Sequence, residues 1–260
     1  DRVIASDALC GQLLPRAPDV VPRLMKTLRD ESYSSADVAQ RISRDVVLTA
    51  EVIRMATGTF HGADRGTPDL ARAVAVIGAL GLRRAISRVV LRPLFDAHGG
   101  SLSARAAPQI WEDADKKARL CVALAAGSSI DPLDAYLAGL LHNTGWSAVL
   151  RIIDGLATPP PPAALAHPQI ADALFVRRDK LFSKLVPPWG LGAELAGLAA
   201  DIGRAGLDAA VSPLAQLLRQ AQGLALLHSL QARGDLAGGV MAPPDLSPAV
   251  REAYQSLSLA

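Results

Sequence analysis

The chain has 260 residues, half of them hydrophobic but only 4% aromatic, and its formal net charge is +2. A chain of this length can bury a substantial core. Because aromatic residues are scarce, Leu, Ala and Val must fill that core. A net charge this small argues against bulk binding to nucleic acid. We therefore expect a globular protein without a nucleic-acid partner.

The cellular compartment is indicated by what the sequence lacks. No apolar run reaches the ~18 residues that a membrane span needs, and the start Asp1-Arg2-Val3 lacks the basic and hydrophobic blocks of a signal peptide. Cys10 and Cys121 lie far apart and form no metal-binding spacing. We expect a cytoplasmic protein without membrane contact.

Helix starts indicate the fold class. A capping residue followed by proline precedes an apolar periodic run four times, at Thr67-Pro68, Asp131-Pro132, Ser212-Pro213 and Ser247-Pro248. No alternation of period two extends beyond a few residues, and no Asn-Gly or Asp-Gly hairpin turn occurs. The sequence therefore predicts an all-α protein.

The predicted helices follow from apolar periodicity and from glycine and proline breaks. A helix capped by Asp45 is expected to end before a glycine-containing loop at 55–67, and Gly81 is expected to separate two further helices. Four consecutive prolines make 158–162 an extended loop. The other expected helices cover 21–28, 34–43, 67–80, 82–95, 109–126, 132–153, 169–185, 192–202, 213–230 and 248–257.

The stretch 137–150 is an apolar helical run that contains a single imidazole, His142, next to an amide, Asn143. A His-Asp pair here would suggest a metal site. A His-Asn pair suggests a metal site that was given up or never existed. Trp146 lies four residues after His142, so the two are expected to share one helix face.

Several short motifs, in order, resemble the HDOD domain, an HD-related output domain of bacterial signalling proteins. The resemblance covers roughly residues 14–202 and implies an N-terminal helical bundle, 1–105, packed on a degenerate HD-like bundle, 106–260, as parts of one domain. The motifs that carry it are Leu-Pro-Arg-Ala-Pro at 14–18, Ile-Ser-Arg-Asp at 42–45, the loop at 54–62, the helix at 73–78 and Ala-Gly-Leu-Leu-His-Asn-Thr-Gly at 138–145.

Relatives with active HD sites are metal-dependent phosphohydrolases. The resemblance implies a metal site made of an upstream His, a His-Asp doublet and a later Asp. In this chain, Asp113 occupies the position of the upstream His, and Asn143 occupies that of the Asp in the doublet. Arg178 lies near the downstream position where a His would be expected. One imidazole cannot hold a catalytic ion. We therefore expect no catalytic residue, metal or cofactor, and a vestigial pocket formed by Asp113, His142, Asn143 and Trp146.

An alternative left open is an unusual metal cluster of Asp113 and His142 with Asp154 or His167. The main expectation for His142 is a core or pocket histidine that is satisfied by a hydrogen bond. Cys121 is expected to be a core residue.

Three basic groups lie on predicted helices. Arg84, Arg88 and Arg92 recur at a spacing of four and line one helix face, which could bind phosphates or an acidic partner or could simply be solvated. The same solvated interpretation applies to Lys116, Lys117 and Arg119, and to Arg177, Arg178, Lys180 and Lys184. The candidate binding residues are Arg84, Arg88, Arg92, Phe60 and His61.

The resemblance and the missing ligands together predict a non-catalytic signalling module that acts by protein or small-ligand binding. The expected partner is a response regulator, a cyclic-dinucleotide enzyme or a nucleotide-like ligand. The alternative is a metal-dependent phosphohydrolase of a nucleotide or cyclic dinucleotide with altered ligands.

Overall fold

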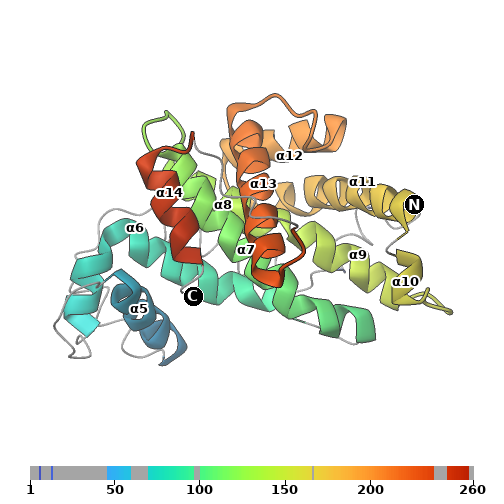
Figure 1. Cartoon of the computed structure of the whole chain (residues 1–260), viewed down its shortest axis with the longest axis horizontal. Helices are drawn as coiled ribbons and strands as arrows, with labels where there is room; N and C mark the ends of the chain where they lie inside the picture. Colours follow the sequence, from blue (N-terminus) through green and yellow to red (C-terminus); the bar gives the residue numbers. More distant parts are fainter. Residues whose placement is uncertain are drawn as a thin grey trace. The chain divides into compact units, whose positions relative to one another are not determined.

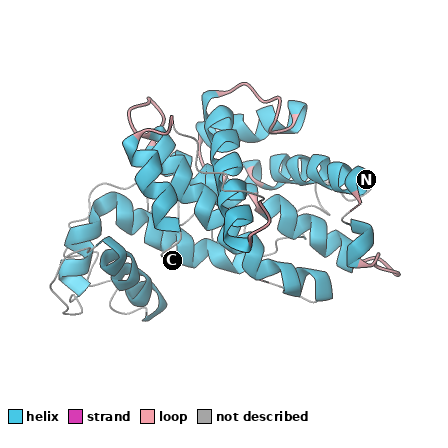
Figure 2. Cartoon of the chain, in the orientation of Figure 1, coloured by secondary structure: helices cyan, strands magenta, loops and turns pink. Residues whose placement is uncertain are grey.

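The computed structural model describes residues 6, 13, 46–59, 70–96, 100–165, 167–236 and 245–257 (Figure 2). Within these ranges the regular structure is entirely helical, which confirms the all-α prediction. None of the helices in this part of the chain is long and apolar enough to cross a membrane. The helices expected at 21–28 and 34–43, and the residues Phe60 and His61, lie outside the described residues.

The chain folds into two compact units. One unit comprises Asp19–Pro93, and the other combines Asp1–Pro18 with Leu94–Ala260. The division that the sequence suggested after residue 105 stays a prediction, and this residue lies inside a helix, Ser101–Ala125.

The unit Asp19–Pro93 contains helices α5 (Val46–Thr59) and α6 (Leu70–Leu91), followed by the 3-10 turn η1 (Arg92–Leu94) at its boundary (Figure 1). The two helices pack against each other through small and branched apolar side chains. This core consists of Val52, Ala56, Ala73, Val74, Leu82 and Ala85.

Two sequence predictions in this unit are wrong. Helix α5 continues to Thr59, so the first residues of the loop expected at 55–67 are helical. Helix α6 runs through Gly81, and its kink lies instead at Gly78, with φ 63° and ψ −175°. A residue with a Cβ rarely adopts such a positive φ, so glycine permits the kink there.

The second unit contains eight further α-helices in its described part (Figure 1). A short 3-10 turn, η2 (Pro187–Trp189), precedes α12. The α-helices are α7 (Ser101–Ala125), α8 (Pro132–His142), α9 (Thr144–Asp154), α10 (Pro162–Leu165), α11 (Pro168–Leu185), α12 (Ala193–Ala205), α13 (Pro213–Arg233) and α14 (Pro248–Ser256).

Helix α8 is the centre of this unit. Every residue from Leu133 to His142 is buried, and helices α7, α11, α12 and α13 pack around them. A helix that is apolar on all sides can be stable only when other elements cover all of it. At Gly139 the backbone of α7 comes so close that an added Cβ would lie 2.6 Å from the backbone nitrogen of Ala118.

The central helix predicted at 132–153 is in fact two helices, α8 and α9, separated at Asn143. Asn143 has φ −73° and ψ −7°, which ends the regular hydrogen bonding of α8. His142 and Trp146 therefore lie on different helices rather than on one shared face, so that prediction is wrong. The interruption falls within the His-Asn doublet itself.

The predicted capping residues have mixed outcomes. Asp131 caps α8, because its Oδ1 accepts hydrogen bonds from the backbone nitrogens of Leu133 and Asp134. Ser247 caps α14 in the same way. Ser212 precedes Pro213 as expected, but its side chain makes no capping bond. Thr67 lies outside the described residues.

Helix α7 begins at Ser101, eight residues earlier than predicted, although Pro108 lies within it. Its free backbone amides are satisfied from elsewhere in the fold. The carboxylate of Asp154, at the end of α9, accepts hydrogen bonds from the backbone nitrogens of Leu102 (3.0 Å) and Ser103 (2.9 Å). The proline-rich loop at 158–162 is non-helical through Pro161, and α10 begins at Pro162.

Candidate functional site

The candidate site is a fully packed polar cluster inside the unit Leu94–Ala260. Its side chains come from three places that are distant in sequence: Lys117 on α7, the His142–Asn143 doublet between α8 and α9, and Arg178 with Asp179 on α11. All five residues are buried, and His142 is 0% exposed. Polar groups at this depth are stable only when they bond to one another.

The two side chains of the doublet converge on one atom. Nζ of Lys117 lies 3.0 Å from Nδ1 of His142 and 2.6 Å from Oδ1 of Asn143. The amide nitrogen of Asn143 donates to the carbonyl oxygen of Ile110, also on α7, over 3.0 Å. Both ends of the Asn143 amide are thus used, and they tie the α8–α9 junction to α7.

The second ring nitrogen of His142 points to α11. Nε2 lies 3.1 Å from Oδ1 of Asp179, and the ring of Phe182 packs edge-on at 5.2 Å between centroids. Because a carboxylate only accepts, Nε2 carries the proton, and Nδ1 accepts from Lys117. This histidine is therefore a buried residue satisfied by hydrogen bonds, as expected from the sequence.

His142 is held in its neutral form. Burial, followed by the nearby cations Lys117 and Arg178, lowers the pKa of His142 to about 3. The hydrogen bond to Asp179 acts in the opposite direction but is weaker.

Asp179 is the anion of the cluster. Its Oδ1 accepts from Nε of Arg178 at 2.8 Å, and its Oδ2 accepts from the backbone nitrogen of Leu207 at 2.8 Å. Burial alone would raise the pKa of Asp179, but the hydrogen bond from His142 and the charge of Arg178 bring it down to about 2. Asp179 therefore stays ionised and neutralises Arg178.

Lys117 is the unusual titrating group. Burial, followed by repulsion from Arg178, lowers the pKa of Lys117 to about 7. The negative charges of Asp113 and Asp179 resist this shift. At neutral pH the side chain is divided between ammonium and amine, and it donates to Asn143 in either form.

Arg178 extends the cluster toward the surface. Its guanidinium carbon lies 5.7 Å from the ring centre of Trp146 and 5.0 Å from that of Phe175. The two aromatic rings themselves pack edge-to-face at 5.2 Å. At the same contact, a Cβ on Gly145 would lie 2.4 Å from the carbonyl oxygen of Arg178, so α9 and α11 pack very closely here.

The residues that the sequence assigned to a vestigial pocket are only partly brought together. His142 and Asn143 share Lys117, and Trp146 is connected to them through Arg178. The carboxylate of Asp113 instead accepts from Gln109 (2.9 Å) and Ser229 (3.3 Å). Asp154 is occupied at the start of α7. In the described ranges, no group of three or more His, Cys, Asp or Glu is placed to hold a metal ion.

The solvated interpretation of two basic groups is wrong at three positions. Lys116 is 7% exposed, Lys117 is 3% exposed and Arg178 is 4% exposed. A sequence signal existed, because Lys117 lies on the face of α7 that also carries the buried Ala114 and Cys121. Cys121 is a core residue, as predicted. Sequence reasoning missed Lys117 and Asp179 as members of the site.

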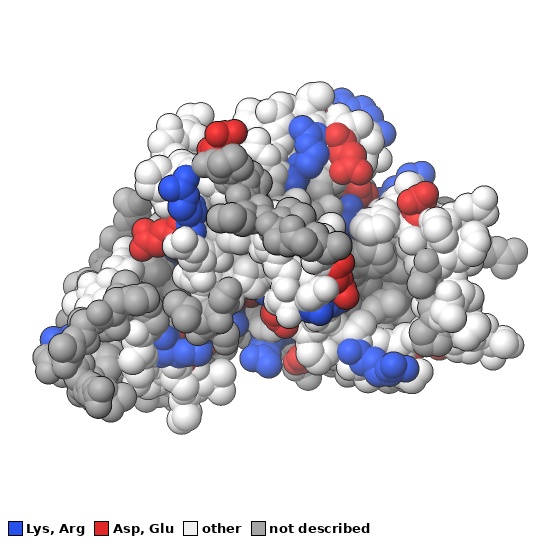
Figure 3. Space-filling view, in the orientation of Figure 1, with Lys and Arg blue, Asp and Glu red and all other residues white. Residues whose placement is uncertain are grey.

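The arginine stripe lies on the other unit. Nε of Arg88 lies 2.9 Å from Oε1 of Glu51 on α5, and the same glutamate pairs with Arg54 at 2.8 Å. Arg84 and Arg88 are half-buried, and Arg92 is exposed. On the face drawn in Figure 3, acidic and basic side chains of the described residues are interspersed rather than gathered in one large patch.

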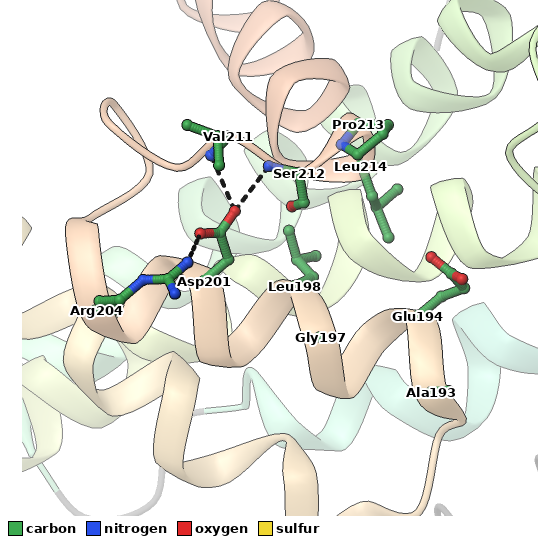
Figure 4. A pocket seen from close by; sticks show the side chains of 10 residues that line it. All are labelled: Ala193, Glu194, Gly197, Leu198, Asp201, Arg204, Val211, Ser212, Pro213 and Leu214. Atoms are coloured by element: carbon green, nitrogen blue, oxygen red, sulfur yellow. Dashed lines mark hydrogen bonds and ion pairs between the residues drawn. The ribbon is translucent and has the colours of Figure 1, made fainter.

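Two surface hollows lie away from the doublet. One, of about 370 Å³, is lined by α12 and the start of α13 (Figure 4). Its central carboxylate, Asp201, already accepts from the backbone nitrogens of Val211 and Ser212 and from Arg204. The other, of about 390 Å³, lies beside His228 and Tyr254. Neither of these hollows is lined by His142.

The fold defines the class: an all-α protein whose helices pack around a buried central helix, α8. The sequence model of the HDOD domain matches residues 14–157. The chain belongs to the HDOD domain family. An uncharacterized protein of Treponema pallidum (strain Nichols) is 24% identical over 138 residues, which are 51% of this chain and 25% of that protein. The match thus spans a quarter of the relative's length.

Three solved structures share the fold. A candidate metal-dependent phosphohydrolase from Shewanella amazonensis SB2B has a TM-score of 0.61 at 20% identity, with 99% of this chain and 97% of that chain covered. An HDOD domain protein with unknown function from Geobacter sulfurreducens has a TM-score of 0.60 at 22% identity, with 94% and 83% covered. A second candidate phosphohydrolase from the same Shewanella strain has a TM-score of 0.60 at 20% identity, with 95% and 90% covered.

A divalent metal, which the name of one neighbour implies, does not fit this chain's doublet. The point shared by His142 and Asn143 is filled by Nζ of Lys117. The amide of Asn143 is a neutral and weak ligand, and the guanidinium of Arg178 is close enough to lower the pKa of both Lys117 and His142. A cation in this place would meet like charge instead of anionic ligands.

Proposed function

We propose that this protein is a non-catalytic module of bacterial signal transduction, whose output is the binding of a partner protein or a small ligand. Membership of the HDOD family supports the signalling role. The observation that carries the non-catalytic part is Nζ of Lys117 within 3.0 Å of both doublet side chains.

The chemistry of the cluster supports binding rather than hydrolysis. Hydrolysis by a metal enzyme needs an ion with an open position for water. An ammonium group can only donate hydrogen bonds, so it provides no coordination position for water. Both nitrogens of His142 are already used, one by Lys117 and one by Asp179, and the ring is 0% exposed, so it has no free site from which to act as a general base.

The phosphohydrolase alternative is tested with the wild-type protein. Purified protein is incubated with Mn²⁺ and a nucleotide in one assay, and with Mn²⁺ and a cyclic dinucleotide in another. The products of each assay are separated by chromatography. We expect no product above the protein-free blank. Turnover that disappears in a His142→Ala variant would contradict the proposal and favour a metal-dependent phosphohydrolase with altered ligands.

The candidate binding face is the stripe of Arg84, Arg88 and Arg92. Arg92 is its exposed member, and Arg88 pairs with Glu51. Guanidinium groups at this spacing suit a phosphate or a carboxylate-rich surface. A response regulator, a cyclic-dinucleotide enzyme or a nucleotide-like ligand would present such groups.

Calorimetry with a cyclic dinucleotide separates the two forms of this binding role. If the stripe binds a nucleotide-like ligand, Arg92→Ala should weaken binding by about tenfold, as expected for loss of one charged hydrogen bond. The control variant Arg105→Ala removes an exposed arginine of α7 and should bind like wild type. Absence of heat at micromolar protein would contradict the small-ligand form and leave protein binding.

A further inference from the structure

The geometry around the His142–Asn143 doublet has the form of a metal site in which the metal is replaced by a side chain. In metal sites, a ligating histidine usually donates a hydrogen bond from its other ring N–H to a carboxylate, a backbone carbonyl or water, which fixes the ring and directs the lone pair at the ion. Here Asp179 accepts from Nε2 of His142 over 3.1 Å, and Nδ1 faces Lys117 at 3.0 Å. The imidazole of His142 thus lies between the carboxylate of Asp179 and the amino group of Lys117.

The neighbouring residue of the doublet meets the same cation. Oδ1 of Asn143 accepts from Nζ of Lys117 over 2.6 Å, the shorter of the two contacts. Because Arg178 is neutralised by Asp179 at 2.8 Å, Lys117 is the remaining cation of the cluster and faces a neutral ring and a neutral amide. Two uncharged acceptors can hold one donor group, but they are fewer than the three protein ligands that hold a catalytic Zn²⁺.

The position of Lys117 is set by the backbone. Its neighbour Ala118 touches α8 at Gly139, where an added Cβ would lie 2.6 Å from the backbone of α7. This close packing fixes the distance from the α7 backbone to the end of α8. The lysine side chain spans that distance and ends at the doublet.

We propose that the amino group of Lys117 is a tethered group that takes the place of a divalent metal ion at the His142–Asn143 doublet. Its contacts with Nδ1 of His142 and Oδ1 of Asn143 keep α7 and the α8–α9 junction together without a diffusible ion. This inference rests on the proposed non-catalytic function, and it adds what replaced the metal. It also implies that one substitution should convert the cluster into a metal site.

The converting variant is Lys117→Asp. The metal–oxygen distance is about 2 Å. An aspartate side chain with a bound ion therefore extends about as far from the backbone as a lysine side chain does. The ion would then meet the new carboxylate, Nδ1 of His142 and Oδ1 of Asn143, while the bond from Asn143 to Ile110 is kept. Imidazole and oxygen ligands suit Zn²⁺, which is therefore the probe.

The matched control is Lys116→Asp. Lys116 is the adjacent lysine of α7 and is also buried, but it bonds to Ser229 (3.2 Å) and pairs with Glu112 (2.6 Å) rather than with the doublet. A second control, Lys117→Asn, removes the charge at the same place without adding a carboxylate. Each protein is refolded with and without Zn²⁺, and metal content, circular dichroism and Tm are measured.

We expect Lys117→Asp to take up one Zn²⁺ per chain and to gain about 5–10 °C in Tm at Zn²⁺ about 100-fold above Kd. Adding His142→Ala to this variant should abolish both effects, and wild type and both controls should show neither. The inference is overturned if Lys117→Asp binds no more Zn²⁺ than Lys116→Asp, or fails to fold even with Zn²⁺. Hydrolysis by wild type would instead overturn the proposed function, so the two failures are distinguishable.

Discussion

Nζ of Lys117 and Oδ1 of Asn143 lie 2.6 Å apart, at the one place where the helical run containing the doublet is interrupted. The amide nitrogen of Asn143 reaches back to the same helix as Lys117, at the carbonyl oxygen of Ile110 (3.0 Å). A single side chain therefore makes two hydrogen bonds to α7, one buried and one partly buried.

Replacing Asn143 with Ala should destabilise the protein by about 1–3 kcal/mol, because the lysine donor and the Ile110 carbonyl would each lose a buried partner. The measurement is the free energy of unfolding in urea. Gln216→Ala is the control, since this exposed glutamine also donates to a backbone carbonyl, that of Val211. It should change stability by less than about 0.5 kcal/mol. An equal loss in both variants would contradict the role of Asn143.

The stability of the wild-type protein should rise with pH from about 7 to 8.5. The pKa of Lys117 is lowered from 10.5 to about 7 by burial and by Arg178, so in this window the unfolded chain binds more protons than the folded one. The free energy of unfolding then increases with pH, by at most about 1.4 kcal/mol per pH unit for one group. The window stops below pH 9, because burial raises the pKa of Cys121 from 9.0 to about 12 and reverses the sign.

The variant Lys117→Met tests this assignment, because it keeps an unbranched side chain but cannot be protonated. Its free energy of unfolding should be independent of pH over the same window. The measurement is a series of urea titrations at steps of about half a pH unit. Lys116→Met, which leaves the doublet untouched, should keep the rise. A rise that survives in Lys117→Met would show that another group is responsible.

Replacing Asp179 with Asn should cost about 3–5 kcal/mol, because Arg178 would remain buried without its counter-charge. The backbone nitrogen of Leu207 would also lose a charged acceptor. Asp172→Asn, at an exposed position of the same helix, is the control and should cost less than about 0.5 kcal/mol. A loss below about 1 kcal/mol in Asp179→Asn would mean that the cluster relaxes without its anion.

Two helical glycines should respond to alanine in opposite directions. At Gly139 the new Cβ would lie 2.6 Å from backbone atoms of Ala118, so Gly139→Ala should destabilise by about 1–3 kcal/mol through overpacking. At Gly197, on α12, nothing lies within 4 Å of the new Cβ, so Gly197→Ala should stabilise by about 0.5–1 kcal/mol. Thermal and urea unfolding of both variants test the contrast.

The sequence was sufficient for the fold class and for several local features. Proline after a capping residue marked the starts of α8, α13 and α14, because proline needs no partner for its missing N–H at a helix start. The cap at Asp131 follows from the same local chemistry. The start of α7 was missed because its capping group, Asp154, comes from a residue more than fifty positions away.

The site was harder to predict, for two physical reasons. The interruption at Asn143 has no proline or positive φ to mark it, and the junction is stabilised by bonds to α7 that local sequence does not contain. The charges of Lys117 and Arg178 looked like solvated helix faces because their burial depends on other helices that pack over them, which is a tertiary property. The His142–Asn143 doublet could be identified from the sequence. Its partners, Lys117 and Asp179, could be identified only from the structure.

The glycine contact at Gly139 limits how this unit can change shape. Helix α8 cannot slide or rotate against α7 without bringing side chains into a space that holds only backbone. We therefore expect the pair to move as one rigid block. Elsewhere in this unit, α9 and α11 also meet through the side chains of Arg178 and Trp146, which can change rotamer without moving the α7–α8 pair.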